Sequence, residues 1–160
     1  MTRKSFLGIP VEGAIIRGHR VPQRPVTDLQ PFLRALLDDD TITEFGWRQY
    51  TPYFNDGEPC VFRVGECWVR TTTDAATVDA ADLWIGRYDT DHPGLGQLER
   101  TADGNSRYQG VDEARYQRAM ALATALEDGA FNDVLLETFG DHASVTVRRD
   151  GITVDYYEHD

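Results

Sequence analysis

The sequence feature that most constrains the fold is an alternating segment near the C-terminus, SVTVRRDGITVDYY, residues 144–157. An Asp-Gly pair between alternating apolar residues is the strongest short-range signal for a β-hairpin. Pairing about Asp150-Gly151 places Val147 opposite Val154 and Val145 opposite Tyr156, with Ile152 on the same face. We therefore predict a hairpin with one buried face and one solvated face, whose register is well specified.

A second hairpin is predicted over Cys60 to Arg70, with Gly65-Glu66 as its two-residue loop. This register pairs Val64 with Cys67, and it pairs Arg63 with Trp68, which suggests a cation–π contact. Cys60 and Cys67 would then lie roughly 13 Å apart along the ladder, too far for a disulfide within one chain. Because an isolated hairpin is marginally stable, both hairpins are expected to join one sheet.

Apolar residues at helical spacing predict helices over residues 28–37, 112–128 and 133–139. In the last of these, Asn132 is the expected cap. With two hairpins, these segments predict an α+β fold, in which an antiparallel sheet of four or more strands carries two or three helices on one face. The 160 residues suit a single domain, and residues 1–25, broken by Gly and Pro, are expected to form a loosely packed N-terminal arm.

Three segments between these elements are harder to assign. Asp38, Asp39 and Asp40 follow the first helix at its negative end, so we expect either a compensating arginine or a capped turn, and TITE (residues 41–44) has capping-box spacing. FGWRQYTPYF, residues 45–54, has strand character, but Pro52 favours an edge strand or an irregular segment. Residues 88–110 are predicted to be a long loop, either functional or mobile.

Charge limits the classes of partner. The net charge is −11, and residues 81–160 carry seven arginines against sixteen carboxylates. Such a field repels phosphate, so direct nucleic-acid binding is disfavoured, and it suits a basic protein partner. No run approaches the ~20 apolar residues of a membrane helix, and the N-terminus lacks the apolar core of a signal peptide. We expect a cytoplasmic protein that does not contact a membrane.

The stretch YTPYFNDGEPC, residues 50–60, is the strongest candidate for a recognition surface. Rigid amphipathic aromatics are favoured at interaction hot spots, and an Asn-Asp-Gly turn would present polar groups beside them. The candidate binding residues are Trp47, Tyr50, Tyr53, Asn55, Asp56 and Glu58. The segment is also explained, and more completely, as a structural corner, in which the aromatics fill the core and the turn leads into the next strand.

Signals for catalysis are weak. Asp89, Asp91 and His92 could supply oxygen and imidazole ligands to a divalent ion, as could other Asp and His pairs, but none has a diagnostic spacing. The sequence holds no nucleophile elbow, phosphate-binding loop or dinucleotide fingerprint. We predict no cofactor and no metal site, and Cys67 is expected to be an inert core residue.

Two segments, W-x-x-YTPYFNDGEPC (Trp47, then residues 50–60) and FGDHASVTVRRDGITVDYYEHD (residues 139–160), resemble elements of a group of small bacterial and phage proteins. The resemblance covers about a quarter of the chain. It implies relatedness, with no activity, fold or binding residue attached.

The favoured hypothesis is a non-enzymatic interaction, inhibitor or accessory protein of bacterial or phage origin, which binds a basic protein through its acidic C-terminal half and the aromatic loop. One alternative is a small metal-dependent enzyme that uses the Asp and His groups of residues 89–92. Another is a DNA mimic, which requires carboxylates arrayed on one face. The sequence leaves the oligomeric state open.

Overall fold

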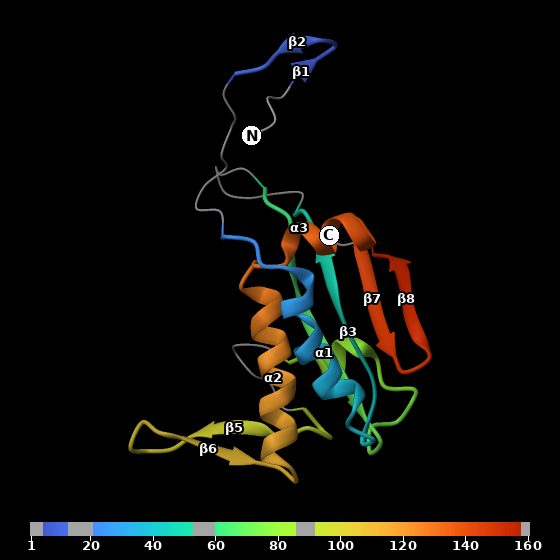
Figure 1. The fold of residues 1–160 in the computed structure, drawn as a ribbon. Helices are drawn as coiled ribbons and strands as arrows, with labels where there is room; N and C mark the ends of the chain where they lie inside the picture. Colours follow the sequence, from blue (N-terminus) through green and yellow to red (C-terminus); the bar gives the residue numbers. More distant parts are fainter. Residues whose placement is uncertain (1–4, 13–20, 53–59, 86–91, 158–160) are drawn as a thin grey trace.

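The computed structural model describes residues 5–12, 21–52, 60–85 and 92–157. The elements follow in this order (Figure 1): β1 (Ser5–Phe6), β2 (Ile9–Pro10), the 3₁₀ turn η1 (Val26–Asp28), α1 (Gln30–Leu37), β3 (Ile42–Tyr50), β4 (Arg63–Thr71), the 3₁₀ turn η2 (Ala80–Leu83), β5 (Gln97–Arg100), β6 (Ser106–Gln109), α2 (Glu113–Glu127), α3 (Asn132–Phe139), β7 (Ala143–Arg148) and β8 (Gly151–Tyr156).

The predicted α+β class is confirmed. Four antiparallel strands form one sheet in the order β4-β3-β7-β8, and α1 and α2 lie over β3 and β4 on one side of it (Figure 1). Strand residues on this helix-covered face pack with helix residues in a common core that includes Phe45, Trp47, Val69, Tyr116 and Leu122. The opposite side, which we call the open face, carries Arg48, Trp68 and Arg70. None of the helices in the described part of the chain has the length and apolar character that crossing a membrane requires.

The C-terminal hairpin is confirmed, but its predicted register is wrong by two residues. Val147 pairs with Ile152 and Val145 pairs with Val154, so the loop is Arg149-Asp150 and Gly151 begins β8. The physical reason lies in Arg149, whose guanidinium donates to three backbone oxygens around the end of α1, those of Leu37, Asp39 and Ile42. These bonds hold Arg149 in the loop.

The hairpin predicted over Cys60–Arg70 is wrong. Residues 63–71 form one strand, β4, which pairs along its length with β3. The Gly65-Glu66 dipeptide marks an irregularity in this ladder, where Gly46 pairs with Trp68 and Arg48 pairs with Gly65. A hairpin would have given β4 only a few cross-strand pairs, whereas β3 offers a partner of nine residues. Arg63 accordingly lies over Tyr50, at 5.9 Å, and it is Arg70 that lies 5.9 Å from Trp68.

The edge strand predicted before Pro52 is also corrected, because β3 is a central strand between β4 and β7. The ladder ends at Tyr50, so the missing N–H of Pro52 falls outside it. The capping box at TITE is wrong as well, since Ile42 already belongs to β3. Of the two explanations for the acidic run after α1, the compensating arginine holds: Arg118 pairs with Asp39 at 2.8 Å.

Asp39 is the best-connected carboxylate of that run. It accepts hydrogen bonds from the amide of Thr41 at 2.9 Å and the hydroxyl of Thr41 at 2.6 Å, besides its contact with Arg118. Burial raises the pKa of this carboxyl, but these bonds to its ionised form outweigh burial and leave the pKa below its ordinary value. Asp39 thus links the end of α1 to α2.

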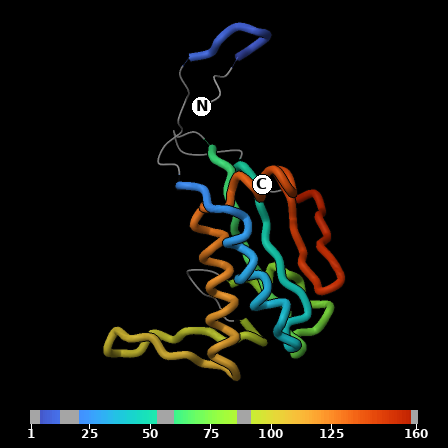
Figure 2. Tube along the Cα trace, in the orientation of Figure 1, coloured from blue at the N-terminus to red at the C-terminus, as the bar shows by residue number. Residues whose placement is uncertain are grey.

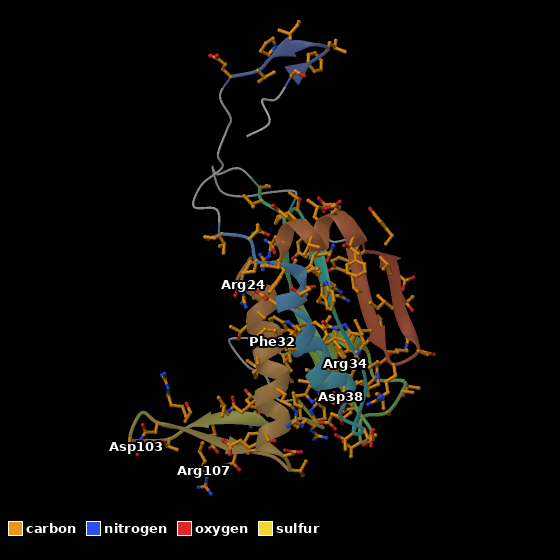
Figure 3. The ribbon with its side chains drawn as sticks, in the orientation of Figure 1. Arg24, Phe32, Arg34, Asp38, Asp103 and Arg107 are labelled. Carbon is orange, nitrogen blue, oxygen red and sulfur yellow. The ribbon has the colours of Figure 1, made fainter. Side chains whose placement is uncertain are left out.

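The helices are close to the predicted ranges. Asp112, predicted as the first residue of α2, is its N-cap and accepts from the Arg115 amide at 3.0 Å. Asn132, expected to cap α3, is instead its first helical residue, and Phe131 takes the capping position without a side-chain hydrogen bond. The predicted long loop at 88–110 is corrected in part, because residues 97–109 form the β5–β6 hairpin. Asp103 lies at its tip (Figure 3), bonded to Thr101 and Asn105.

The N-terminal segment has little contact with the rest. Residues 5–12 are all exposed, and β1 and β2 pair only with each other among the described strands. Figure 2 shows this short hairpin projecting away from the sheet and helices. Its apolar side chains Phe6, Leu7 and Ile9 are more than half exposed. The arm predicted from the sequence extended to residue 25, but Gln23 and Arg24 are bonded to the turn between α2 and α3: the Gln23 amide donates to the Gly129 carbonyl and the Arg24 N–H to the Ala130 carbonyl, both at 2.9 Å.

Candidate functional site

The structure describes two of the predicted recognition residues, Trp47 and Tyr50, and places them on opposite faces of β3. Trp47 is buried beneath α3, 1% exposed, and its indole N–H donates to Gln49 at 3.0 Å. Tyr50 lies on the open face and is half-buried. The other candidates, Tyr53, Asn55, Asp56 and Glu58, lie outside the described residues. Of the described pair, Tyr50 alone reaches the surface.

A backbone irregularity creates the most distinctive surface of the described chain. Glu66 has φ +51°, in the left-handed region that non-glycine residues rarely adopt. This bulge changes the alternation of β4, so that Val64 and Cys67 both face the core, and Glu66 turns its side chain toward the open face. There its carboxylate lies 3.3 Å from the guanidinium of Arg48 on β3. Strained backbone of this kind often marks functional sites.

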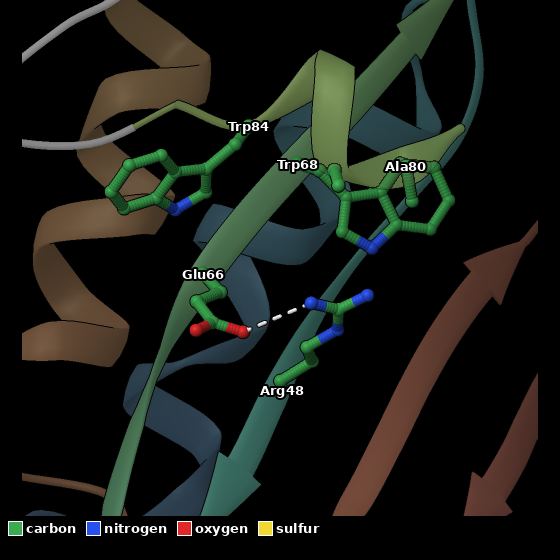
Figure 4. Close-up of a pocket in the computed structure, with 6 residues that line it drawn as sticks. Arg48, Glu66, Trp68, Ala80 and Trp84 are labelled. Carbon is green, nitrogen blue, oxygen red and sulfur yellow. Dashed lines mark hydrogen bonds and ion pairs between the residues drawn. The ribbon is translucent and has the colours of Figure 1, made fainter. Parts of the chain in front are cut away.

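Beside this ion pair lies a hollow that we call the tryptophan pocket (Figure 4). Its volume is about 180 Å³, and it is lined by Arg48, Glu66, Trp68, Ala80, Ala81 and Trp84. In this view the Trp84 indole lies on the Glu66 side of the ion pair and the Trp68 indole on the Arg48 side. Trp84 is 39% exposed, a large apolar surface to leave in water.

The indole of Trp68 can lie across the sheet because position 46 is glycine. A Cβ at Gly46 would come within 2.9 Å of the Trp68 indole nitrogen and within 2.1 Å of the Val145 carbonyl oxygen. Any larger residue would push the indole off the open face or separate β3 from β7. Gly46 therefore shapes the floor of the tryptophan pocket.

A buried arginine, Arg70, positions the wall of the tryptophan pocket that η2 and Trp84 form. Arg70 donates to Glu44 at 2.9 Å and to the carbonyl oxygens of Ala75 and Val78 at 2.6 and 2.7 Å. These bonds fix the turn that leads from β4 into η2. The chain then returns to β4, where Trp84 bridges Trp68 and the following amide donates to the Cys67 carbonyl at 2.7 Å. The backbone of Trp84 is thus fixed by the turn that precedes it and by its own pairing with β4.

A second hollow, which we call the β4 groove, lies on the other side of Trp84, between β4 and α2. Its volume is about 720 Å³, and it is lined by Arg63, Val64, Gly65, Glu66, Trp84, Met120, Thr124, Glu127 and Asp128. Three of these residues are carboxylates and one is an arginine. Glu66 and Trp84 line both hollows, so the two form one continuous surface.

The edge of β4 along this groove is available for pairing. β4 is the outer strand of the sheet, and the contact from the η2 side is a single bridge at Trp68. Among the residues that the structure describes, no strand pairs with Arg63 to Glu66 on the side away from β3. An unpaired strand edge can accept an extended segment of another chain.

Aromatic and cationic side chains continue along the open face. The Arg48 guanidinium lies 4.4 Å from the ring centre of Tyr157, within cation–π distance. Tyr50 lies 5.8 Å from the same ring. Burial, followed by the nearby charge of Glu66, raises the pKa of Tyr50, so its hydroxyl stays protonated at neutral pH. These contacts favour recognition rather than proton transfer.

His92, one of the residues proposed for a metal site, has a structural role. It is 4% exposed, and its Nδ1 accepts from the amides of Gly94 and Leu95 at 3.1 and 2.8 Å. The proton therefore lies on Nε2, which contacts the Val69 carbonyl oxygen at 2.6 Å. Both ring nitrogens are used within the fold. Asp89 and Asp91 lie outside the described residues.

The described part of the chain contains no group of three or more His, Cys, Asp or Glu side chains that could hold a metal ion. Cys67 is fully buried in the core, and burial raises the pKa of its thiol. A protonated, inaccessible thiol is a poor nucleophile, as the sequence predicted.

Sequence reasoning missed this site for two reasons. The Gly65-Glu66 dipeptide was visible, but a bulge and a hairpin loop share the same residue types. Trp68 and Trp84 lie sixteen positions apart and meet only because the chain returns to β4. The usable signal was Trp84 itself, a large apolar residue in a segment without clear periodicity.

Comparison of the chain with protein-family models, with curated proteins and with solved structures found no match in any of the three.

Proposed function

We propose that the protein is a non-enzymatic binding module that takes an extended, basic segment of another protein into the β4 groove. The observation that carries the proposal is the edge of β4 between Arg63 and Glu66, which no strand among the described residues pairs on the side away from β3, beside a groove whose walls hold three carboxylates and an exposed tryptophan. A basic segment fits the net charge of −11 as well as this local charge.

Three features of the groove would each contact a different part of the bound segment. The backbone of β4 would hydrogen bond with the incoming strand, as in other cases of strand addition. Glu127 and Asp128, both exposed on the last turn of α2, would pair with its arginine or lysine side chains. Trp84 would supply an apolar anchor at the centre, where hot spots usually lie.

The tryptophan pocket extends this surface onto the open face. Its indoles offer faces for a guanidinium or an aliphatic stem, and Glu66 carries the adjacent negative charge. Because Glu66 is paired with Arg48, an arriving cation must share or displace this half-buried pair, which is worth about 0–1 kcal/mol. Replacing Arg48 by the guanidinium of a partner as the counter-ion of Glu66 therefore has a small energetic cost.

The test uses two capped peptides of equal length, one alternating Arg and Val and one alternating Glu and Val. Titration against the full chain, followed by tryptophan fluorescence and by amide hydrogen exchange, should show binding of the Arg-Val peptide alone. Exchange should slow at Arg63 to Glu66, and affinity should fall as salt rises.

Variants localise the site. Trp84→Ala should weaken binding by about thirtyfold, the effect of losing a hot-spot anchor of about 2 kcal/mol. Asp128→Asn should weaken it several-fold, whereas Glu99→Gln on the exposed strand β5 serves as a matched control and should change nothing. Equal affinity for both peptides, or tight binding that survives Trp84→Ala, would contradict the proposal.

A further inference from the structure

The strand β8, at the far edge of the sheet from the β4 groove, has an apolar side that nothing in the described structure covers. All six of its residues are exposed. Ile152, Val154 and Tyr156 are 51%, 44% and 73% exposed. They pair across the ladder with Val147, Val145 and Ala143, which are buried. The apolar face of the core therefore continues onto β8, beyond the reach of α1 and α2 (Figure 1).

The free backbone groups of β8 belong to the same three residues. The amide of Tyr157 donates to the His142 carbonyl at 2.7 Å, which shows that odd-numbered residues here direct their N–H and C=O groups toward β7. Because these groups alternate along an antiparallel strand, those of Ile152, Val154 and Tyr156 point away from the sheet. The outer edge thus offers both hydrogen-bonding groups and apolar side chains.

Natural edge strands are usually protected by proline, lysine, a bulge or a short length. β8 has six residues, no lysine or proline, and continuous pairing with β7. Its sequence, GITVDY, is rich in residues that favour strands. Such an edge needs a covering partner to avoid uncontrolled pairing.

We infer that the partner is a second copy of this chain, paired antiparallel through β8 about Val154 to give a continuous eight-stranded sheet. This register is self-complementary. Val154 meets its own equivalent, and Ile152 meets Tyr156 of the second copy, so each outward-pointing residue forms a hydrogen-bonded pair. On the other side of the strand, Thr153 meets Asp155 of the second copy, so the hydroxyl faces a carboxylate and the two carboxylates do not face each other.

The contact is independent of the β4 groove and has the opposite response to salt. Each copy carries a net charge of −11, so the two repel at low ionic strength, and added salt screens this repulsion. The dimer should therefore strengthen as salt rises, whereas capture of a basic peptide should weaken.

Analytical ultracentrifugation of the full chain should show a concentration-dependent change from 18.1 kDa to twice that mass. Val154→Lys places two like charges face to face and should raise the dissociation constant by about tenfold or more. Circular dichroism should show that this exposed substitution leaves the monomer folded. A monomer at every concentration and salt level would overturn the inference.

Cysteine crosslinking tests the register, in a Cys60→Ser background. Val154→Cys places two cysteines directly opposite, about 5.5 Å apart between Cα atoms, within disulfide range. Ile152→Cys is the matched control, because it is equally exposed on the same face but meets Tyr156. Oxidation should crosslink the first variant and leave the second monomeric. Equal crosslinking of both variants would overturn the register. If the dimer were lost when residues 1–12 are deleted but kept in Val154→Lys, the contact would belong to the N-terminal arm and the inference would be wrong.

Discussion

Replacement of Gln49 by leucine tests how the buried end of the sheet is held together. Gln49 is fully buried, and its amide makes three hydrogen bonds, one within β3 and two that join β3 to α3 and its C-cap. Its Oε1 accepts from the Trp47 indole at 3.0 Å, and its Nε2 donates to the carbonyl oxygens of Leu135 and Gly140 at 2.8 and 2.7 Å. Leucine has a similar volume but can make none of these bonds.

The expected loss follows from these partners. An indole N–H left buried without an acceptor costs about 1–3 kcal/mol, and each of the two carbonyls loses a bond worth about 1 kcal/mol. Burial of the more apolar leucine side chain offsets about 1 kcal/mol of this loss in the free energy of unfolding. The free energy of unfolding should thus fall by about 2–4 kcal/mol, out of a typical total of about 5–15 kcal/mol, and the melting temperature by about 5–15 °C.

Urea unfolding, followed by both far-UV circular dichroism and tryptophan fluorescence, measures this loss. Gln109→Leu, at an exposed position of β6, is the control and should stay within about 0.5 kcal/mol of the parent. Gln49→Glu adds a pH test. Burial would raise the pKa of the introduced carboxyl in the folded state, so its stability should decline as pH rises above about 4.3, where the unfolded chain ionises first. A loss below about 1 kcal/mol in Gln49→Leu would refute the reasoning.

Three further outcomes are expected. Gly46→Ala should lower the free energy of unfolding by about 1–3 kcal/mol, measured in urea, because its Cβ would come within 2.1 Å of the Val145 carbonyl oxygen. Asp39→Asn should be less stable than the parent at neutral pH, and this difference should disappear as pH falls through the lowered pKa of Asp39, since the stabilising ionised form is then lost. In thiol titration of the native protein, Cys60 should react and Cys67 should react only on unfolding, because Cys67 is fully buried and its pKa is raised.

Each of these has a clear counter-result. An unchanged urea midpoint in Gly46→Ala would mean that β3 and β7 can move apart at Gly46 without loss of stability. A pH-independent difference for Asp39→Asn would show that the ionised carboxylate is not the stabilising form. Modification of two thiols in the folded protein, at a rate unrelated to unfolding, would contradict the burial of Cys67.

The elements specified by local chemistry could be predicted from the sequence. Asp150-Gly151 and the alternation around it identify the C-terminal hairpin, and apolar stripes identify the helices within two residues. What failed was pairing at longer range. The register of that hairpin depends on Arg149, which reaches carbonyls more than a hundred residues earlier in the chain. Nothing local to the turn reveals that contact.

The same limit explains the hairpin that does not form. Gly65-Glu66 has acceptable loop chemistry, and only the presence of β3 as a longer partner decides against it. The candidate site depends on that outcome, because a loop at Glu66 would have separated its carboxylate from Arg48. Of the residues predicted to bind, Trp47 is buried, as the interpretation of its segment as a structural corner with aromatics in the core predicts.

The position of β3 has a consequence for how the protein is made. Its two neighbours are synthesised at very different times. β4 begins about twenty residues after the start of β3, but β7, at residues 143–148, begins about a hundred residues after it. During translation, the edge of β3 that faces β7 therefore has no strand partner until residues 143–148 have left the ribosome. The β3–β4 pair can form early, but completion of the sheet is late, and a nascent chain that stalls before residue 143 presents the open edge of β3 to chaperones.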